Sequence, residues 1–114
     1  MTTHLPDPFY HLEELQEIAR GYYGVAVSKS TRRIIDPHKR MDNEYAIEKV
    51  RSVLLALTQR NFRYAMAQDM DNSDIYLAKW KGRAIYFKLS LRHHPDTEGR
   101  YVWVFSFHTP ESPL

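Results

Sequence analysis

The sequence predicts an α+β domain in which a small antiparallel sheet, at least a three-stranded C-terminal meander, packs against two or three helices. Two observations support this prediction. The C-terminal half holds runs that are rich in aromatic and β-branched residues and alternate in polarity, which is typical of strands. The N-terminal half holds two segments whose apolar residues recur at helical spacing. The helices are therefore expected to precede the sheet along the chain.

Two neighbouring strands are expected at residues 84–91 and 101–108. The loop between them contains Pro95, Asp96 and Gly99 and is short enough for an antiparallel hairpin. In the first strand, the residues that share the apolar face are Ile85, Phe87, Leu89 and Leu91. In the second, the residues expected on that same face are Tyr101, Trp103, Phe105 and Phe107. The opposite face is then left with the polar groups.

The register of this hairpin decides which polar side chains meet. With Arg92 opposite Arg100, the resulting pairs are Tyr86 with Ser106, Lys88 with Val104, and Ala84 with His108. This register places Tyr86, Lys88 and His108 on one face within cross-strand reach, about 5–8 Å at Cβ. A slip by one residue would move one strand's set to the other face.

The N-terminal part begins with residues 1–8, which contain two prolines and no periodicity, so a loose leader is expected. A single domain at residues 9–110 and a tail at residues 111–114 follow. Within the domain, an amphipathic helix is expected at residues 9–20, where Gly21 ends it.

A strand or extended link is expected at residues 22–29, and the basic residues 30–40 are expected to hold a short surface helix capped by Ser30 or Thr31. Asp42 is a good N-cap for the main helix, which is expected to pack on the apolar face of the sheet.

The remaining segments lie between the main helix and the hairpin. Residues 62–66 are expected to form a short helix that displays Arg63 and Tyr64. A polar turn leads into a strand that begins at Asp74, and Lys81 and Gly82 form the turn that returns the chain into the hairpin.

The composition excludes several kinds of site. The chain has 114 residues and no cysteine, so disulfides, thiol catalysis and cysteine-ligated zinc or iron–sulfur clusters are excluded. No signal-like or long apolar segment is visible, which favours a cytoplasmic protein without a membrane partner. Basic residues cluster at 29–40 and 79–92, although the net charge is only +2. Such clusters suit a polyanion, and the alternative is a solvated basic surface.

No metal or other cofactor is expected. Asp69, Asp71 and Asp74 suggest a calcium loop, but the required glycine and terminal glutamate are missing, so solvated loop carboxylates are favoured. A loop turn is likewise favoured over a metal site for the pair of histidines that precedes Asp96.

Four blocks, at residues 62–66, 74–76, 82–88 and 104–108, together resemble the MqsR family of type II toxins in their order and spacing. The resemblance implies a RelE-like fold, metal-independent cleavage of mRNA, and a cognate antitoxin, which in that family is a DNA-binding repressor.

The family's functional positions fall on five residues of this chain. The tyrosine and lysine of its Y-x-K strand correspond to Tyr86 and Lys88, and a functional lysine after its final S-F corresponds to His108. The lysine of its F-Y-K-S-M block falls at Tyr64, and a glutamine before its D-x-Y element falls at Ser73.

Metal-free RNA cleavage needs a base, an acid and a cation that stabilises the charged phosphorane. His108 is the candidate base or acid because an imidazole titrates near neutral pH. Lys88 is expected to hold the phosphate, and Tyr86 to stack on a base or donate a proton. The further residues expected to contact RNA are Arg63, Tyr64, Lys79 and Arg83.

Each of these residues also has an ordinary structural interpretation. Lys88 can be a solvated strand lysine, Tyr86 one half of a cross-strand pair, and His108 an incidental histidine at a strand end. A non-catalytic module that holds RNA or an acidic protein on the same face therefore stays open as an alternative. So does an interaction protein that pairs a partner strand with residues 22–29 or with its C-terminal strand.

Overall fold

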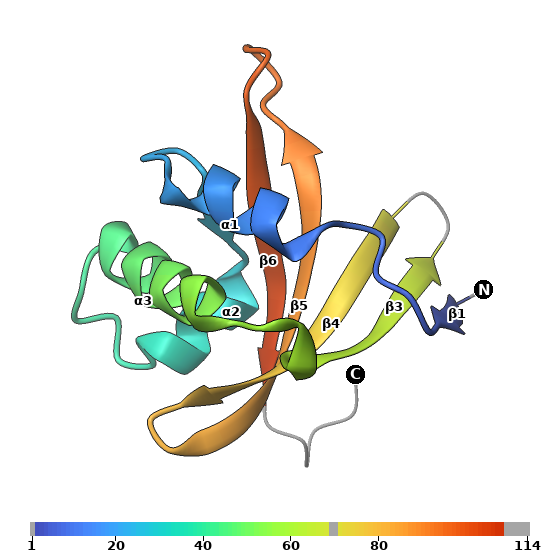
Figure 1. Cartoon of the computed structure of the whole chain (residues 1–114). Helices are drawn as coiled ribbons and strands as arrows, with labels where there is room; N and C mark the ends of the chain where they lie inside the picture. The colour runs from blue at the N-terminus through green and yellow to red at the C-terminus, as the bar shows by residue number, and fades with distance from the viewer. Residues whose placement is uncertain (1, 69–70, 109–114) are drawn as a thin grey trace.

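The computed structural model describes residues 2–68 and 71–108, and the side chains of residues 3–67 and 71–105. Within these residues, three helices lie together over one face of a six-stranded sheet (Figure 1). The helices are α1 (Leu12–Arg20), α2 (Lys29–Ile35) and α3 (Asn43–Ala56), followed by a short 3₁₀ helix, η1 (Gln59–Asn61). The α+β class with a sheet packed against helices is confirmed.

The sheet has the strand order β1-β3-β4-β5-β6-β2. Its strands are β1 (Thr2–Leu5), β2 (Val25–Val27), β3 (Phe62–Gln68), β4 (Asp71–Trp80), β5 (Arg83–His93) and β6 (Arg100–His108). All neighbours pair antiparallel except β2 and β6, which pair parallel. The expected C-terminal meander is therefore β4-β5-β6, and β1, β2 and β3 extend it. No helix of the described chain is long and apolar enough to cross a membrane.

Two sequence predictions about strands are wrong. Residues 2–5 of the expected loose leader form edge strand β1, which pairs with β3. Residues 62–66, expected to be helical, lie within β3, where Ala65 is buried while Tyr64 is half-buried on the other face. A run this short suits helix or strand, and here strands on both sides take up the backbone hydrogen bonds of β3.

Asp74 explains why α1 begins at Leu12 rather than at residue 9. Its carboxylate accepts the backbone N–H groups of Phe9 at 2.8 Å and Tyr10 at 3.1 Å, which holds that stretch outside the helix. The prediction that Asp74 is a solvated loop carboxylate is wrong, because its side chain is fully buried in β4. Burial raises its pKa, and the two N–H donors oppose that rise.

The helix caps follow local side-chain chemistry. The main helix α3 begins after Asp42, whose carboxylate accepts the backbone N–H of Tyr45, as expected. The cap of α2 is Ser28, whose hydroxyl accepts the backbone N–H of Thr31, and not Ser30 or Thr31 itself. Helix α1 ends at Arg20 before Gly21, as expected.

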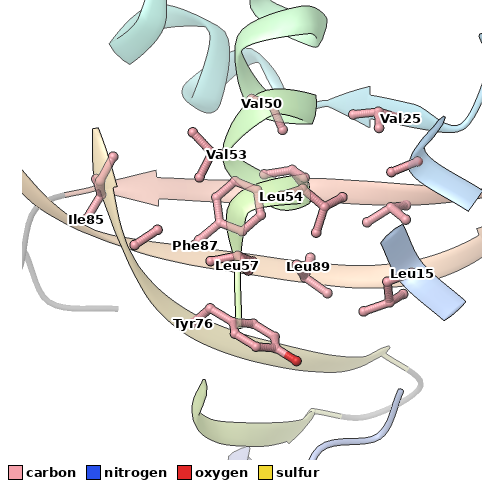
Figure 2. Packing of buried hydrophobic residues seen from close by; sticks show 14 of the residues in the cluster. Leu15, Val25, Val50, Val53, Leu54, Leu57, Tyr76, Ile85, Phe87 and Leu89 are labelled. Atoms are coloured by element: carbon pink, nitrogen blue, oxygen red, sulfur yellow. The ribbon is translucent and has the colours of Figure 1, made fainter. Parts of the chain in front are cut away.

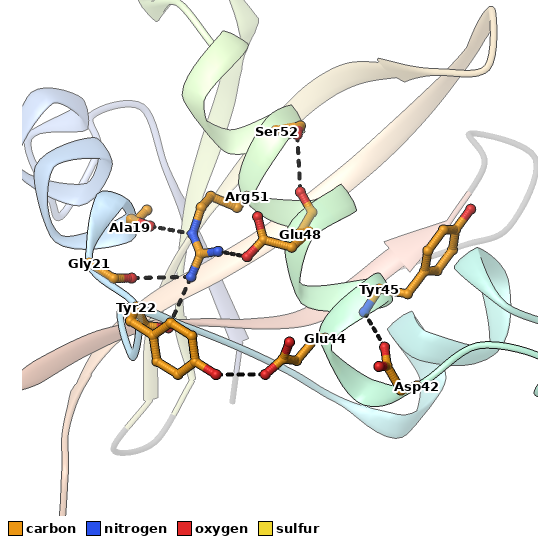
Figure 3. Close-up of polar contacts among 9 residues, drawn as sticks. All are labelled: Ala19, Gly21, Tyr22, Asp42, Glu44, Tyr45, Glu48, Arg51 and Ser52. Carbon is orange, nitrogen blue, oxygen red and sulfur yellow. Dashed lines mark hydrogen bonds and ion pairs between the residues drawn. The ribbon is translucent and has the colours of Figure 1, made fainter.

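Arg51 of α3 ties the end of α1 to the rest of the fold (Figure 3). Its guanidinium donates to the carbonyl of Ala19 at 2.7 Å and to those of Gly21 and Tyr22 at 3.1 Å each, and it pairs with Glu48. These carbonyls lie at the C-terminus of α1, where a positive charge is favourable. Arg51 thereby positions the turn that leads into β2.

The core lies between the helices and the sheet. Figure 2 shows Val50, Val53 and Leu54 of α3 packed toward Phe87 and Leu89 of β5. The alternation predicted for β5 is confirmed, because Ile85, Phe87 and Leu89 are all buried on this face.

The face assigned to β6 is wrong. Arg92 pairs with Tyr101 rather than with Arg100, so Val102 and Val104 face the core and are fully buried. Tyr101, Trp103 and Phe105 consequently lie on the opposite face, and the side chain of Phe107 lies outside the described part. Both alternating sets of β6 are apolar, so the pattern alone does not distinguish its faces, and a register change of one residue exchanges them.

Candidate functional site

The face of the sheet turned away from the helices is named the outer face. Its residues on the four strands β3 to β6 are Tyr64, Met66, Ser73, Ile75, Leu77, Tyr86, Lys88, Ser90, Arg92, Tyr101, Trp103 and Phe105. The residues at its centre, Ser73, Ile75 and Ser90, are only 2%, 0% and 2% exposed. The rings and cations around them are half-buried, so part of each is accessible from solvent.

Cations and aromatic rings alternate along this face. The Lys88 ammonium lies 4.6 Å from the centre of the Phe105 ring. The Arg92 guanidinium lies 5.2 Å from the Trp103 ring centre and 5.8 Å from that of Phe105. Arg92 also pairs with Asp71 on β4, at 3.1 Å. The rings hold both positive charges in place by cation–π attraction, with each charge lying over a ring face.

Lys88 lies in a partly desolvated environment. Its partial burial lowers the pKa of its ammonium, and Asp71 opposes this effect weakly. Lys88 pairs with Ile75 of β4 on one side and with Ser106 of β6 on the other, near the middle of the sheet. A charge placed there interacts more strongly with a bound anion than a fully solvated charge does.

Tyr64 and Tyr86 form the second part of the site. Burial raises the pKa of Tyr64, and the nearby Tyr86 raises it further. The Tyr64 ring stacks on His4 of β1 with 4.3 Å between ring centres. Tyr64, which was expected to contact RNA, therefore lies on the same face as Tyr86 and Lys88.

The backbone of β6 brings His108 opposite Tyr86. The expected pairs Tyr86–Ser106, Lys88–Val104 and Ala84–His108 are wrong. In the structure, Tyr86 pairs with His108 and Lys88 pairs with Ser106. The difference has two parts. The register is already displaced by one residue from Arg92–Tyr101 to Leu89–Val104, and a bulge at Phe105 displaces it by one more. The structure gives the backbone position of His108, and its imidazole lies outside the described side chains.

Three residues expected to contact RNA lie away from this cluster. Arg63 is the extra residue of a bulge in β3, and its guanidinium donates to the carbonyls of Arg60 and Phe62. Lys79 and Arg83 are exposed at the far end of the β4–β5 hairpin. They occupy successive pairs of the ladder and so project to opposite faces, which means that they do not act on one phosphate together.

Four residues of the site were not predicted from the sequence: His4, Arg92, Trp103 and Phe105. His4 was placed in the expected leader, and the two aromatic residues of β6 were placed in the core. The feature of the sequence that could have identified the buried face of β6 is its pair of valines. Val102 and Val104 have a size and a β-propensity that suit a tightly packed inner face.

Two other expectations can be compared with the structure. Among the described residues, no group of three or more metal-ligating side chains is close enough to hold an ion. The His94 ring lies tilted against the Tyr101 ring, with 4.7 Å between the ring centres. Of the strands offered for partner pairing, β2 lies at an edge of the sheet, whereas β6 lies between β5 and β2.

The resemblance drawn from the four sequence blocks stays a prediction. No protein-family model, curated protein or solved structure matches this chain.

Proposed function

We propose that this protein is a metal-independent endoribonuclease that binds single-stranded mRNA on its outer face. We further propose that it is the toxin of a type II toxin–antitoxin system, and that a cognate antitoxin protein binds it and inhibits its activity. The observation that supports RNA binding best is the alternation of Lys88 and Arg92 with Trp103 and Phe105 on one accessible face. Bases stack on such rings, and the cations neutralise the phosphates between them. The toxin role rests on the resemblance to the MqsR family.

The proposed reaction transfers the phosphorus from one oxygen to another. The 2′-oxygen of a ribose forms a bond to the adjacent phosphorus, and the bond from phosphorus to the 5′-oxygen breaks. His108 and Tyr86 are the two proton-transferring groups: one takes the 2′-hydroxyl proton, and the other supplies a proton to the leaving 5′-oxygen. Lys88 stabilises the negative charge that builds on the phosphorane. The backbone pairing of His108 with Tyr86 supports this assignment.

The test is an RNA assay in EDTA that follows binding and product together. Purified protein is expected to convert single-stranded RNA into fragments that end in a 2′,3′-cyclic phosphate and begin with a 5′-hydroxyl. Salt-sensitive binding without any product would instead select the non-catalytic module. That alternative is favoured by one observation, the burial of Ser73 at the family's glutamine position. If the protein neither binds nor cleaves RNA, the remaining hypothesis is the interaction protein that pairs one of its strands with a partner strand.

The lowered pKa of Lys88 predicts an alkaline limb in the cleavage rate. Because the charged form is the active one, activity is lost as pH rises through the pKa of Lys88. Burial lowers that pKa, so the loss occurs at a lower pH than for a free lysine. In Lys88→Arg the guanidinium stays charged, and the part of this limb that the titration of Lys88 causes is expected to disappear.

The measurement is a pH profile of kcat/KM for both proteins, corrected for RNA hydrolysis without protein. An alkaline limb at the same pH in the parent and in Lys88→Arg would show that another group titrates.

A further inference from the structure

A second cluster of cations lies outside the outer face, between α2 and the turn that follows it. This basic pocket has a volume of about 310 Å³ and is lined by Lys29, Arg32, Arg33, Asp36 and Lys39. Four of these five side chains are positively charged, and three of those four are exposed, while Arg32 is half-buried. The pocket is therefore open to solvent and strongly positive.

The single acid of the basic pocket does not neutralise it. Asp36 is only 7% exposed, and its carboxylate accepts the backbone N–H groups of Arg40 at 3.1 Å and Met41 at 2.9 Å. These bonds fold the turn after α2 back onto the helix, and Lys39 takes a left-handed conformation with φ of 53°. Within the described residues, no carboxylate forms an ion pair with any of the four cations. The fold thus holds the positive charges together and leaves them available to an anion.

The basic pocket is attached to the strand that carries part of the outer face. The backbone N–H of Ser28 donates to the carbonyl of Val104 at 2.9 Å, and the Thr31 hydroxyl donates to the same carbonyl at 3.4 Å. Strand β2 pairs with β6 only as far as Val104, and the next residue is Phe105, whose ring contacts Lys88. The pocket therefore lies on the helix side of β6, and the outer face lies on the other side of that strand (Figure 1).

We propose that the basic pocket is a second phosphate-binding subsite for the same RNA strand that the outer face binds. A single strand stacked on Phe105 continues over the edge of β6, and one or more of its backbone phosphates then lie among the four cations. This inference rests on the proposed function. It adds that the preferred substrate is a single-stranded RNA long enough to occupy both sides of β6.

The test compares two RNA lengths, about 4 and about 16 nucleotides, which span the usual footprint of a single-strand-binding domain. Both carry 2′-O-methyl groups, so that they bind without being cleaved. Binding is measured by fluorescence anisotropy over a range of salt concentrations. In Arg32→Gln/Arg33→Gln, the salt slope for the long RNA is expected to fall by about 1.4, because each lost phosphate contact contributes about 0.7 on a single strand. The slope for the short RNA is expected to stay the same.

The control is Arg20→Gln/Lys49→Gln, which removes the same charge from α1 and α3. If the long RNA gives the same slope with both double variants, the second subsite is wrong. In that case, if Lys88→Gln lowers the affinity for both RNA lengths, the proposal that RNA binds on the outer face still holds. If the parent binds neither RNA, both proposals fail. Should Arg32→Gln/Arg33→Gln not fold, Lys29→Gln/Lys39→Gln is expected to give the same change of slope.

Discussion

Replacing Lys88 by alanine is expected to lower the rate of RNA cleavage at least ~100-fold, and replacing His108 by alanine is expected to do the same. Lys88 is the half-buried cation at the centre of the outer face, so its loss leaves the charge on the phosphorane without its nearest partner. His108 lies opposite Tyr86 in the backbone ladder, and its loss would remove one of the two proposed proton-transferring groups. The measurement is single-turnover cleavage of labelled RNA in EDTA.

Lys49→Ala is the matched control for this prediction. Lys49 is also a half-buried lysine over an aromatic ring, 5.2 Å from the ring centre of Tyr45, but it lies on α3. Its removal costs the protein the same charge and the same kind of ring contact, and we expect cleavage close to the parent rate. A Lys88→Ala/His108→Ala double variant that cleaves as fast as the parent would show that the site assignment is wrong.

Replacing Phe87 by alanine is expected to lower the free energy of unfolding by about 3–5 kcal/mol, the usual cost of emptying a buried aromatic position. Phe87 is fully buried beneath α3, where its ring fills the core between helices and sheet. Such a loss is a large share of the stability of a small domain. The measurement is denaturant unfolding followed by circular dichroism.

Phe105→Ala provides the comparison for the outer face. Phe105 is half-buried, so the same truncation there is expected to cost only about 1–2 kcal/mol, roughly half of what full burial contributes. RNA affinity is expected to fall instead, because a stacking surface and a partner of Lys88 are lost. Equal losses of stability at the two positions would mean that the outer face is packed as tightly as the core.

The parts of the fold that the sequence predicted are those with one-sided patterns. Strand β5 carries its apolar residues on a single face, and α3 has both a strong N-cap and an apolar stripe, so local chemistry determines them. Tyr86 and Lys88 were placed on one face for the same reason. In β6 both faces are apolar, and only the register with β5 and the bulge at Phe105 show which face is buried.

Long-range contacts account for the other errors. Asp74 is acidic and follows a polar turn, but its burial depends on N–H groups that lie 64 and 65 residues earlier in the chain. Strand β1 likewise exists because β3 offers it an edge. Neither partner is visible in a local window of sequence, and tertiary pairing overrides local preference in both cases.

RNA binding on the outer face is tested most directly by NMR mapping of the binding site, with a 2′-O-methyl single strand that the protein does not cleave. Binding of RNA on the outer face predicts that the largest amide and side-chain shifts fall there, at Tyr64, Lys88 and Trp103, together with the imidazole of His108. Shifts confined to the helix-covered side of the sheet, with Lys88 and Trp103 unchanged, would contradict it.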